Sequence, residues 1–482
     1  MPRPKEATEP ADRSIARLRE DLGGRVIVPE DAAYDRARTV VPGDVDLRPA
    51  AIARPRDAGE VARVIEAARV SGLELAVRGG GHSGAGHGLT EGGIVLDLAE
   101  MRALDIDVEG RTAWAKTGLT TGEYSDAVGA HGLATGFGDT GSVGLGGITL
   151  GGGIGFLVRK HGLTIDSLLA AEVVTADGRV LQVDAESHPD LFWAIRGGGG
   201  NFGVATRLRF RLQEVGTVVG GQLMLPATPD LVHSLVEASE AAQEELSAII
   251  NVMPALPMPD VPEDQAGRLV AWVLLVFAGP IEAGEAAVAP LRGLAEPILD
   301  TVGPMRYPKM FEEPEGAEEY HPTAVARTMF VNRIDRAVAG TIVSTLESSD
   351  ADVRVAQIRV LGGAMARVPA DATAFAHRDS RIMVNLAAFY EGPEDRAVRD
   401  AWVTAFAATL RQEDAGAYVN FLGDEGEARV RDAYPGPTWD RLAAIKARYD
   451  PTNLFRRNQN ILPGDRGNVI DGRIRPPADE FH

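Results

Sequence analysis

The residues best suited to chemistry form one hexapeptide, Arg78-Gly79-Gly80-Gly81-His82-Ser83, directly after an apolar run. Glycine lets a backbone turn sharply and approach a ligand closely, and successive free N–H groups in such a turn bind anions. The imidazole of His82 is a nitrogen nucleophile that titrates near neutral pH. These groups suit a cofactor that carries a pyrophosphate and a reactive ring, as flavin adenine dinucleotide (FAD) does. The alternative interpretation is a plain turn after a strand.

Two more glycine clusters follow, at residues 136–155 and 196–204. The first is interrupted by apolar residues, which argues against a flexible linker. The second contains the spacing G-x-G-x-x-G, which in a dinucleotide-binding fold follows a strand and opens a helix. Here a helical pattern over residues 189–195 precedes the motif and a strand pattern over residues 206–212 follows it. This order excludes nicotinamide binding at the motif, and both clusters instead suit backbone that passes close to a flat or anionic group.

These clusters, followed by a C-terminal motif, resemble the para-cresol methylhydroxylase (PCMH)/vanillyl-alcohol oxidase flavoprotein superfamily, and most closely its berberine-bridge-enzyme-like (BBE-like) oxidases. The resemblance covers about residues 49–463 and implies an FAD-linked oxidoreductase. Its landmarks are Arg78-Gly79-Gly80-Gly81-His82-Ser83, Gly144-Leu145-Gly146-Gly147 with Gly151-Gly152-Gly153-Ile154-Gly155, Gly199-Gly200-Asn201-Phe202-Gly203, and Tyr449-Asp450-Pro451-Thr452-Asn453-Leu454-Phe455 with Gln459-Asn460-Ile461.

The resemblance assigns FAD binding to residues in all three clusters and near the C-terminus. These residues are Arg78, Gly79, Gly80, Gly81, His82, Ser83, Thr140, Ser142, Val143, Gly146, Gly147, Gly151, Gly152, Gly153, Gly155, Gly200, Asn201, Gly203, Val204, Asn420 and Asn460.

The same resemblance gives His82 the role of the covalent flavin ligand. In the family, the corresponding histidine is joined to the 8α-methyl carbon of the flavin. His87 lies nearby but does not directly follow the three glycines. Many relatives add a second link through a cysteine at the position that aligns with Thr140, and this chain contains no cysteine. The expectation is a single 8α-histidyl link, as in the branch that includes 6-hydroxy-D-nicotine oxidases.

Tyr418 and Asn420 are the predicted catalytic pair, because Tyr418-Val419-Asn420 resembles the family's Tyr-x-Asn motif. In relatives the tyrosine faces the substrate side of the flavin and often serves as the base. A free tyrosine has a pKa near ~10, so this role needs a neighbouring cation or a contact that stabilises the phenolate. An amide at Asn420 both donates and accepts hydrogen bonds. The alternative for Tyr418 is a pocket wall that only binds substrate.

Several other polar residues are weaker candidates. Arg367, His377 and Arg378 lie beside strand patterns of the later part of the chain, where such residues are more often solvated or paired than functional. His131 and His161 fall in the glycine-rich region and fit packing or capping better than catalysis. His377 has no neighbour at ligand spacing, so no metal site is predicted.

The resemblance also implies the fold that positions these residues. It predicts an α+β protein with a two-subdomain PCMH-type FAD-binding domain and a substrate domain with an antiparallel sheet covered by helices. A change of character near residue 215 agrees with this division. The predicted parts are a flexible arm over residues 1–12, an FAD-binding domain over 13–215, a substrate-binding domain over 216–415, a C-terminal return to the FAD domain over 416–463, and a tail over 464–482.

Periodicity predicts the individual elements. Helices are expected at residues 57–70, 226–246, 280–294 and 438–449, and a strand hairpin with an Asp-Gly turn at 172–183. Further strands are expected at residues 73–77, 93–98, 111–116, 206–212, 269–277, 355–361 and 382–389.

Composition limits the class of protein. The chain has 482 residues, an ordinary apolar fraction and a net charge of −20, which disfavours nucleic acid and anionic membrane surfaces as partners. The missing cysteines exclude disulfides, thiolate catalysis and iron–sulfur clusters. No apolar run is long enough to span a membrane and no secretory signal is recognised, so the default expectation is a cytoplasmic protein.

Together these features predict an FAD-dependent oxidase. Hydride would pass from an alcohol or amine carbon of a small organic substrate to flavin N5, and dioxygen would then be reduced to hydrogen peroxide. Two alternatives stay open: a dehydrogenase that uses a quinone or protein acceptor, and a flavin-binding protein without turnover.

Overall fold

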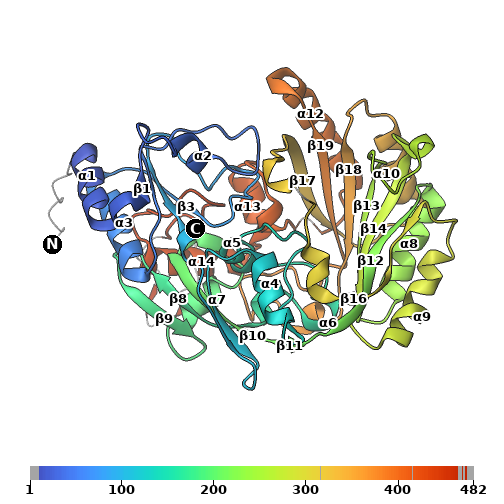
Figure 1. Cartoon of the computed structure of the whole chain (residues 1–482), viewed down its shortest axis with the longest axis horizontal. Coiled ribbons are helices and arrows are strands. Elements are labelled where there is room, and N and C mark those ends of the chain that lie inside the picture. Colours follow the sequence, from blue (N-terminus) through green and yellow to red (C-terminus); the bar gives the residue numbers. More distant parts are fainter. Residues whose placement is uncertain (1–9, 315, 415, 465–468, 471–472, 475–482) are drawn as a thin grey trace, which may run out of the picture.

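The computed structural model describes residues 10–314, 316–414, 416–464, 469–470 and 473–474. Two smaller sheets, coloured blue to green, lie on one side of the molecule, and one large sheet lies on the other (Figure 1). The C-terminal segment, coloured red, returns to the side of the smaller sheets (Figure 1). None of the helices in these residues is long and apolar enough to cross a bilayer.

The first sheet positions the hexapeptide. Its strand order is β1 (Val26–Ile27), β2 (Ala51–Ala53), β4 (Ile94–Asp97), β3 (Leu75–Arg78), and the last three strands are parallel. Helix α3 (Ala58–Ser71) leads into β3. It begins where Asp57 accepts a hydrogen bond from the Glu60 amide, and it ends at Gly72, whose φ of +72° suits glycine. Because β3 ends at Arg78, the glycine loop starts at the carboxyl end of a parallel strand.

The second sheet is antiparallel and carries the third glycine cluster. Its order is β5 (Leu104–Asp107), β6 (Thr112–Lys116), β10 (Val204–Arg211), β8 (Leu168–Val174), β9 (Val180–Asp184). Strand β10 starts directly after the cluster, and helix α7 (Pro189–Ala194) precedes it. The elements therefore follow the order expected from the sequence, a helix, the glycine loop and then a strand. A dinucleotide-binding motif would need a strand before the glycines and a helix after them. A short pair, β7 (Leu133–Ala134) with β11 (Gln213–Glu214), lies beside this sheet.

The large sheet is antiparallel and carries helices on one face. Its order is β15 (Leu299–Asp300), β12 (Thr217–Pro226), β14 (Leu269–Phe277), β13 (Leu246–Pro254), β18 (Arg354–Val360), β19 (Ile382–Phe389), β17 (Ala324–Val331), with β16 (Gly303–Arg306) also paired to β12. Helices α8 (Pro229–Ala241), α9 (Ile281–Arg292) and α10 (Arg336–Glu347) cover the outer face (Figure 1). The opposite face is turned toward the smaller sheets, so side chains on alternate strand positions reach the junction.

The remaining helices are short or belong to the C-terminal return. They are α1 (Ala11–Leu22), α2 (Tyr34–Arg38), α4 (Thr121–Gly129), α5 (Leu145–Leu150), α6 (Val158–His161), α11 (Ala364–Arg367), α12 (Gly392–Leu410), α13 (Glu427–Ala433) and α14 (Pro437–Tyr449). Near the end, β20 (Val469–Ile470) pairs with β21 (Arg473–Ile474).

The α+β prediction is confirmed, and the expected strands at residues 269–277 and 382–389 coincide with β14 and β19. The predicted helix over residues 226–246 was wrong at its end. Helix α8 stops at Ala241, and Leu246 opens β13, whose residues are all buried and so carry no amphipathic period. Of the predicted arm 1–12, residues 1–9 lie outside the described residues, and Ala11 already begins α1. The predicted tail lies largely outside them as well.

Candidate cofactor and active site

A single cavity of about 530 Å³ brings the predicted motifs together. Its walls come from the three glycine clusters, from β18 and β19 of the large sheet, and from the C-terminal return. The predicted site residues that line it are Arg78, Gly79, Gly80, Gly81, His82, Ser83, Thr140, Val143, Gly146, Gly147, Gly200, Asn201, Gly203, Val204, Tyr418 and Asn420.

The glycine loops fit against one another so closely that side chains are excluded. A Cβ at Gly80 would come within 2.3 Å of the Gly144 backbone nitrogen, and one at Gly144 within 2.2 Å of that of Gly80. Gly81 has a φ of +74°, a conformation that L-residues with side chains rarely adopt. Gly147 and Gly200 face open space instead, where a Cβ would project into the cavity. The cradle therefore leaves exposed backbone beside the cavity, as a flat or anionic cofactor requires.

Arg78 holds the first loop in place. Its side chain is buried and donates hydrogen bonds to the Asp97 carboxylate at 2.8 Å and to the Ala37 carbonyl at 2.6 Å. The other terminal nitrogen, Nη1, is buried without a partner among the described residues. That free donor and the bare glycine amides form a donor set suited to phosphate oxygens.

His82 presents an unused nitrogen. Its Nε2 atom is buried and has no partner among the described residues. Burial lowers the pKa of His82, while the Glu313 charge and the Ser142 backbone oppose the shift. The imidazole is therefore held largely neutral near pH 7, with a lone pair available as a nucleophile. His87 also lines the cavity, and burial with the Arg457 charge lowers its pKa to about 4.

Tyr418 is buried in the cavity wall with its phenol oxygen already accepting two hydrogen bonds. The donors are the Gly153 amide and the Asn420 side-chain amide, each at 2.9 Å. Burial raises the pKa of Tyr418, whereas these two donors and the Arg359 charge lower it. The hydroxyl proton has no protein acceptor among the described residues, so it is free for a ligand.

Asp139 and Arg359 close the cavity between the glycine-rich part and the large sheet. The Arg359 guanidinium donates to the Asp139 carboxylate at 2.6 Å and to the Ile154 carbonyl at 2.8 Å. The arginine is 3% exposed. Each charge is thus neutralised by the other across the junction.

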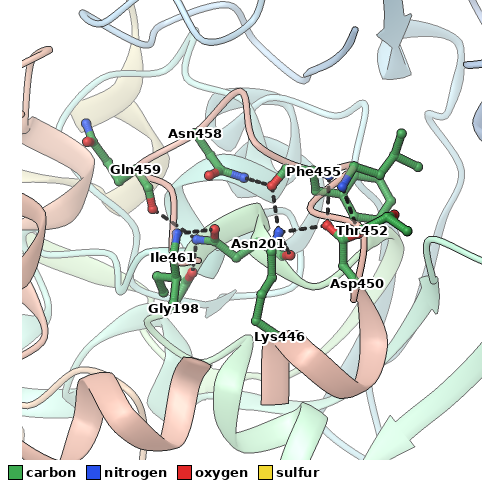
Figure 2. A network of polar contacts seen from close by, with 10 residues as sticks. Gly198, Asn201, Lys446, Asp450, Thr452, Phe455, Asn458, Gln459 and Ile461 are labelled. Carbon is green, nitrogen blue, oxygen red and sulfur yellow. Dashed lines mark hydrogen bonds and ion pairs between the residues drawn. The ribbon is translucent and has the colours of Figure 1, made fainter. Parts of the chain in front are cut away.

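A second network fixes the third glycine cluster to the C-terminal return (Figure 2). Lys446 and Asp450, both fully buried, form an ion pair at 2.7 Å. The Lys446 ammonium also donates to the carbonyls of Asn201 at 2.7 Å and Phe455 at 2.8 Å. The Asn201 side chain bonds the Gly198 and Gln459 carbonyls and the Ile461 amide (Figure 2). The cavity wall near Asn201 is therefore held by residues that lie more than 240 positions later in the chain.

Some predicted cofactor residues lie behind the lining instead of in it. Among them, a Cβ at Gly151 would meet Asn420, and one at Gly155 would come within 1.5 Å of the Phe137 carbonyl oxygen. These glycines allow close packing beneath the cavity. The predicted residues outside the lining are Ser142, Gly151, Gly152, Gly153, Gly155 and Asn460.

The weaker candidates all lie away from the cavity lining. Arg367 is an exposed residue paired with Glu244, and Arg378 is buried against Asp166 in a two-point ion pair at 2.8 and 2.9 Å. The His377 ring packs on Phe330, 4.9 Å between centroids. His131 is exposed. For His161, burial lowers the pKa to about 4.

Sequence reasoning missed the residues that the large sheet contributes. Gln357 and Arg359 on β18 and Asn385 on β19 line the cavity, as do Phe421 and Arg457. A signal existed, because polar residues interrupt apolar strands at positions 357, 359 and 385. Polar side chains at positions that should be buried commonly mark a site.

Comparison with known proteins gives concordant matches. A family model described as an FAD binding domain matches residues 49–184, and one described as berberine and berberine-like matches residues 417–462. The (R)-6-hydroxynicotine oxidase of Paenarthrobacter nicotinovorans is 31% identical over 457 residues, covering 92% of this chain and 97% of its own. The xylooligosaccharide oxidase of Thermothelomyces thermophilus is 29% identical, covering 86% and 88%.

Solved structures agree on the fold. The crystal structure of 6-hydroxy-D-nicotine oxidase from Arthrobacter nicotinovorans has a TM-score of 0.81 at 28% identity, covering 92% of this chain and 98% of that one. A chitooligosaccharide oxidase has a TM-score of 0.81 at 22% identity, covering 95% and 100%, which supports the fold alone. The matches extend over both the glycine-rich part and the large sheet. This chain is an FAD-linked oxidoreductase and belongs to the BBE-like branch of the PCMH-type FAD oxidases.

Proposed function

We propose that this protein oxidises an alcohol or amine carbon of a small organic substrate and uses dioxygen as the electron acceptor. Bound FAD would supply the redox chemistry, taking a hydride from the substrate and passing electrons to dioxygen to give hydrogen peroxide. Residues 13–215 and 416–463 would hold the cofactor, and residues 216–415 would face the substrate. The relatives named above as oxidases act on quite different compounds, a nicotine derivative and oligosaccharides.

The observation that carries the proposal is the position of Tyr418 and His82 on one cavity. A cofactor held by the glycine loops at His82 would share that cavity with the phenol of Tyr418. We infer that His82 forms the single covalent link through its unpartnered Nε2 atom. A second link is excluded, since Thr140 stands where a cysteine would be needed and the chain has none.

Tyr418 is the proposed proton acceptor. A base role needs contacts that stabilise the phenolate, and the amides of Gly153 and Asn420 supply two of them. Burial works against ionisation and raises the pKa of Tyr418 above its ordinary value near 10. The residue would therefore be mostly a neutral phenol near pH 7, and only the fraction that has released its own proton to solvent could accept a proton from the substrate.

The decisive experiment follows cofactor oxidation state with and without air. Purified holoenzyme is mixed anaerobically with a panel of alcohols and amines while the 450 nm band is recorded, and air is then admitted with a peroxide assay. In an oxidase, a substrate abolishes the 450 nm absorbance of the flavin, and air restores it rapidly with one hydrogen peroxide formed per turnover. Bleaching without rapid recovery in air, but with recovery upon adding a quinone, would instead identify a dehydrogenase. A protein that only dithionite can reduce would be a carrier without turnover.

A further inference from the structure

One row of side chains crosses five strands of the large sheet. Residues directly opposite one another in an antiparallel register place their side chains on the same face. The neighbouring positions on these strands, such as Ile250, Ile358 and Leu386, pack into the helix-covered core. The row therefore lies on the other face, toward the cavity. Its members in strand order are Trp272, Asn251, Gln357, Asn385 and Thr328.

The first half of the row is held by its own hydrogen bonds. Gln357 donates to the Asn251 side-chain oxygen at 3.0 Å, and Asn251 donates to the Trp272 carbonyl at 3.2 Å. The Gln357 oxygen in turn accepts from the Arg359 guanidinium at 2.8 Å. The side-chain amides of Asn251 and Gln357 therefore have little hydrogen-bonding capacity left for a ligand.

Asn385 differs from its neighbours in the row. Its side-chain oxygen is buried and has no partner, and its side-chain nitrogen makes no hydrogen bond to any residue that the structure describes. The residue lines the same cavity as Tyr418. A buried amide without a partner is costly, and in a cavity wall that cost is removed when a ligand supplies the missing bond.

The charge of this end of the cavity is balanced. Asp139 is the one carboxylate among the lining residues described, and it is paired with Arg359 at 2.6 Å. A cationic substrate would find no free carboxylate there, and an anionic one would find the guanidinium already occupied. Transfer of an unpaired charge into such a site is unfavourable.

We propose that Asn385 anchors the substrate through its side-chain amide, and that the substrate is an electrically neutral molecule with an O–H or N–H donor. This inference rests on the proposed function and narrows it, because it selects neutral alcohols over amines that are protonated at neutral pH. The bound substrate would lie between Asn385 on the sheet side and Tyr418 on the C-terminal return.

The test uses matched probes that differ in charge. The pairs are benzyl alcohol with benzylamine, cyclohexylmethanol with cyclohexylmethylamine, and glucose with glucosamine, together with neutral xylobiose and cationic 6-hydroxynicotine. Binding is followed anaerobically at pH 7 through perturbation of the flavin absorbance, and reduction through its loss. We expect the neutral member of each responding pair to bind more tightly and to reduce the flavin faster.

Two variants separate anchoring from structure. Asn385→Leu keeps the size of the side chain and removes the amide, and we expect KM for the best neutral probe to rise about three- to tenfold with kcat little changed. Thr328→Val is the matched control, because Thr328 lies opposite Asn385 and its buried hydroxyl is also unpartnered, yet it does not line the cavity. The control should leave KM and kcat within about twofold of wild type. Asn385→Asp should shift preference toward the cationic member of each pair.

The outcomes distinguish this inference from the proposed function. Tighter binding of the cationic members to wild type, or an unchanged KM in Asn385→Leu, would overturn the anchor. Reduction of the flavin by cationic probes but by none of the neutral ones would overturn it too. If no probe of either charge reduces a flavin that dithionite reduces, the oxidase proposal itself fails.

Discussion

The side-chain amide of Asn420 donates a hydrogen bond at 2.9 Å to the phenol oxygen of Tyr418, two residues earlier in the chain. The same amide nitrogen also donates to the Ile148 carbonyl at 3.1 Å in the second glycine cluster. The phenol is therefore fixed to the cofactor cradle from two directions, through Asn420 and through the Gly153 amide. These two donors use the phenol oxygen as an acceptor and leave its proton available to a ligand.

Tyr418→Phe should lower the rate of anaerobic flavin reduction by about a hundredfold or more, since general-base contributions are typically about 10² to 10⁴. Ring packing is kept, so flavin content should not change. Because burial raises the pKa of Tyr418, its ionised fraction in wild type grows with each unit of pH through neutrality and beyond. The wild-type reduction rate should rise with pH, and the variant should lose that slope. A loss smaller than about tenfold with a raised KM would assign Tyr418 to binding.

His82→Ala should abolish covalent attachment of the cofactor. Wild-type protein precipitated with acid should stay yellow, and its intact mass should exceed that of the polypeptide by one FAD. In the variant the colour should move entirely to the supernatant. His87→Ala is the control, because His87 lines the same cavity but does not follow the glycines, and it should keep the link. A yellow precipitate from the His82 variant would contradict the assignment.

Val143→Leu tests the use of dioxygen. Val143 lines the cavity in the second glycine cluster, so its side chain limits the space beside a flavin bound there. A bulkier side chain should slow reoxidation by about tenfold, a barrier increase of about 1.4 kcal/mol, while reduction by substrate is unchanged. Stopped-flow measurement of the two half-reactions decides the matter. An equal loss in both would show that Val143 is no gate.

Much of the fold can be read from local patterns, because those patterns reflect local physics. Helix α3 has its cap at Asp57 and an apolar stripe, β14 is a continuous apolar run, and β19 is an apolar run that only Asn385 interrupts. The sequence patterns did not predict strands β12 and β13, for two different reasons. The first contains Gly220 and Gly221, which weaken a strand pattern, and the second is separated from the preceding helix only by residues 242–245, which contain no glycine, proline, asparagine or aspartate to signal a turn.

The site divides in the same way. The glycine loops and Tyr418 carry motifs, so the sequence alone points to them. The pairing of Arg359 with Asp139 joins residues 220 positions apart, and nothing local to either predicts the contact. The free amide of Asn385 is equally hidden, since only the register of β19 against β18 shows that Gln357 lies opposite it.

Lys446→Met should destabilise the protein by about 3–5 kcal/mol, because it leaves the Asp450 carboxylate buried without its cation. The Asn201 carbonyl would lose a donor as well, so FAD should dissociate more readily from a His82→Ala background. Arg448→Met on the same helix is the control. Arg448 forms an ion pair with Asp190 at the surface, where the Arg448 side chain is 65% exposed. Such exposed pairs contribute about 0–1 kcal/mol to the free energy of unfolding. Chemical denaturation of both variants gives the comparison.

Stability should fall in mild acid. Burial lowers the pKa of His161 to about 4 from an ordinary value of 6.5. As the pH falls, His161 therefore takes up a proton in the unfolded chain before it does so in the folded protein. The contribution of neutral His161 to the free energy of unfolding is complete above pH 6.5 and is lost between pH 6.5 and about pH 4. His161→Gln should flatten this part of the curve of Tm against pH. An unchanged curve in the variant would assign the acid sensitivity to other groups, among them His87, whose pKa is also lowered to about 4.

The hydrogen bond from Lys446 to the Asn201 carbonyl also has a consequence for biosynthesis. A nascent chain emerges from the ribosome with all three glycine clusters made, while the segment that holds the third one in place is still untranslated. The last part of the chain to be synthesised contains Tyr418, Asn420 and Lys446. We therefore expect stable binding of the cofactor only after translation has passed residue 461, because the hydrogen bonds that hold the third glycine cluster are complete only then.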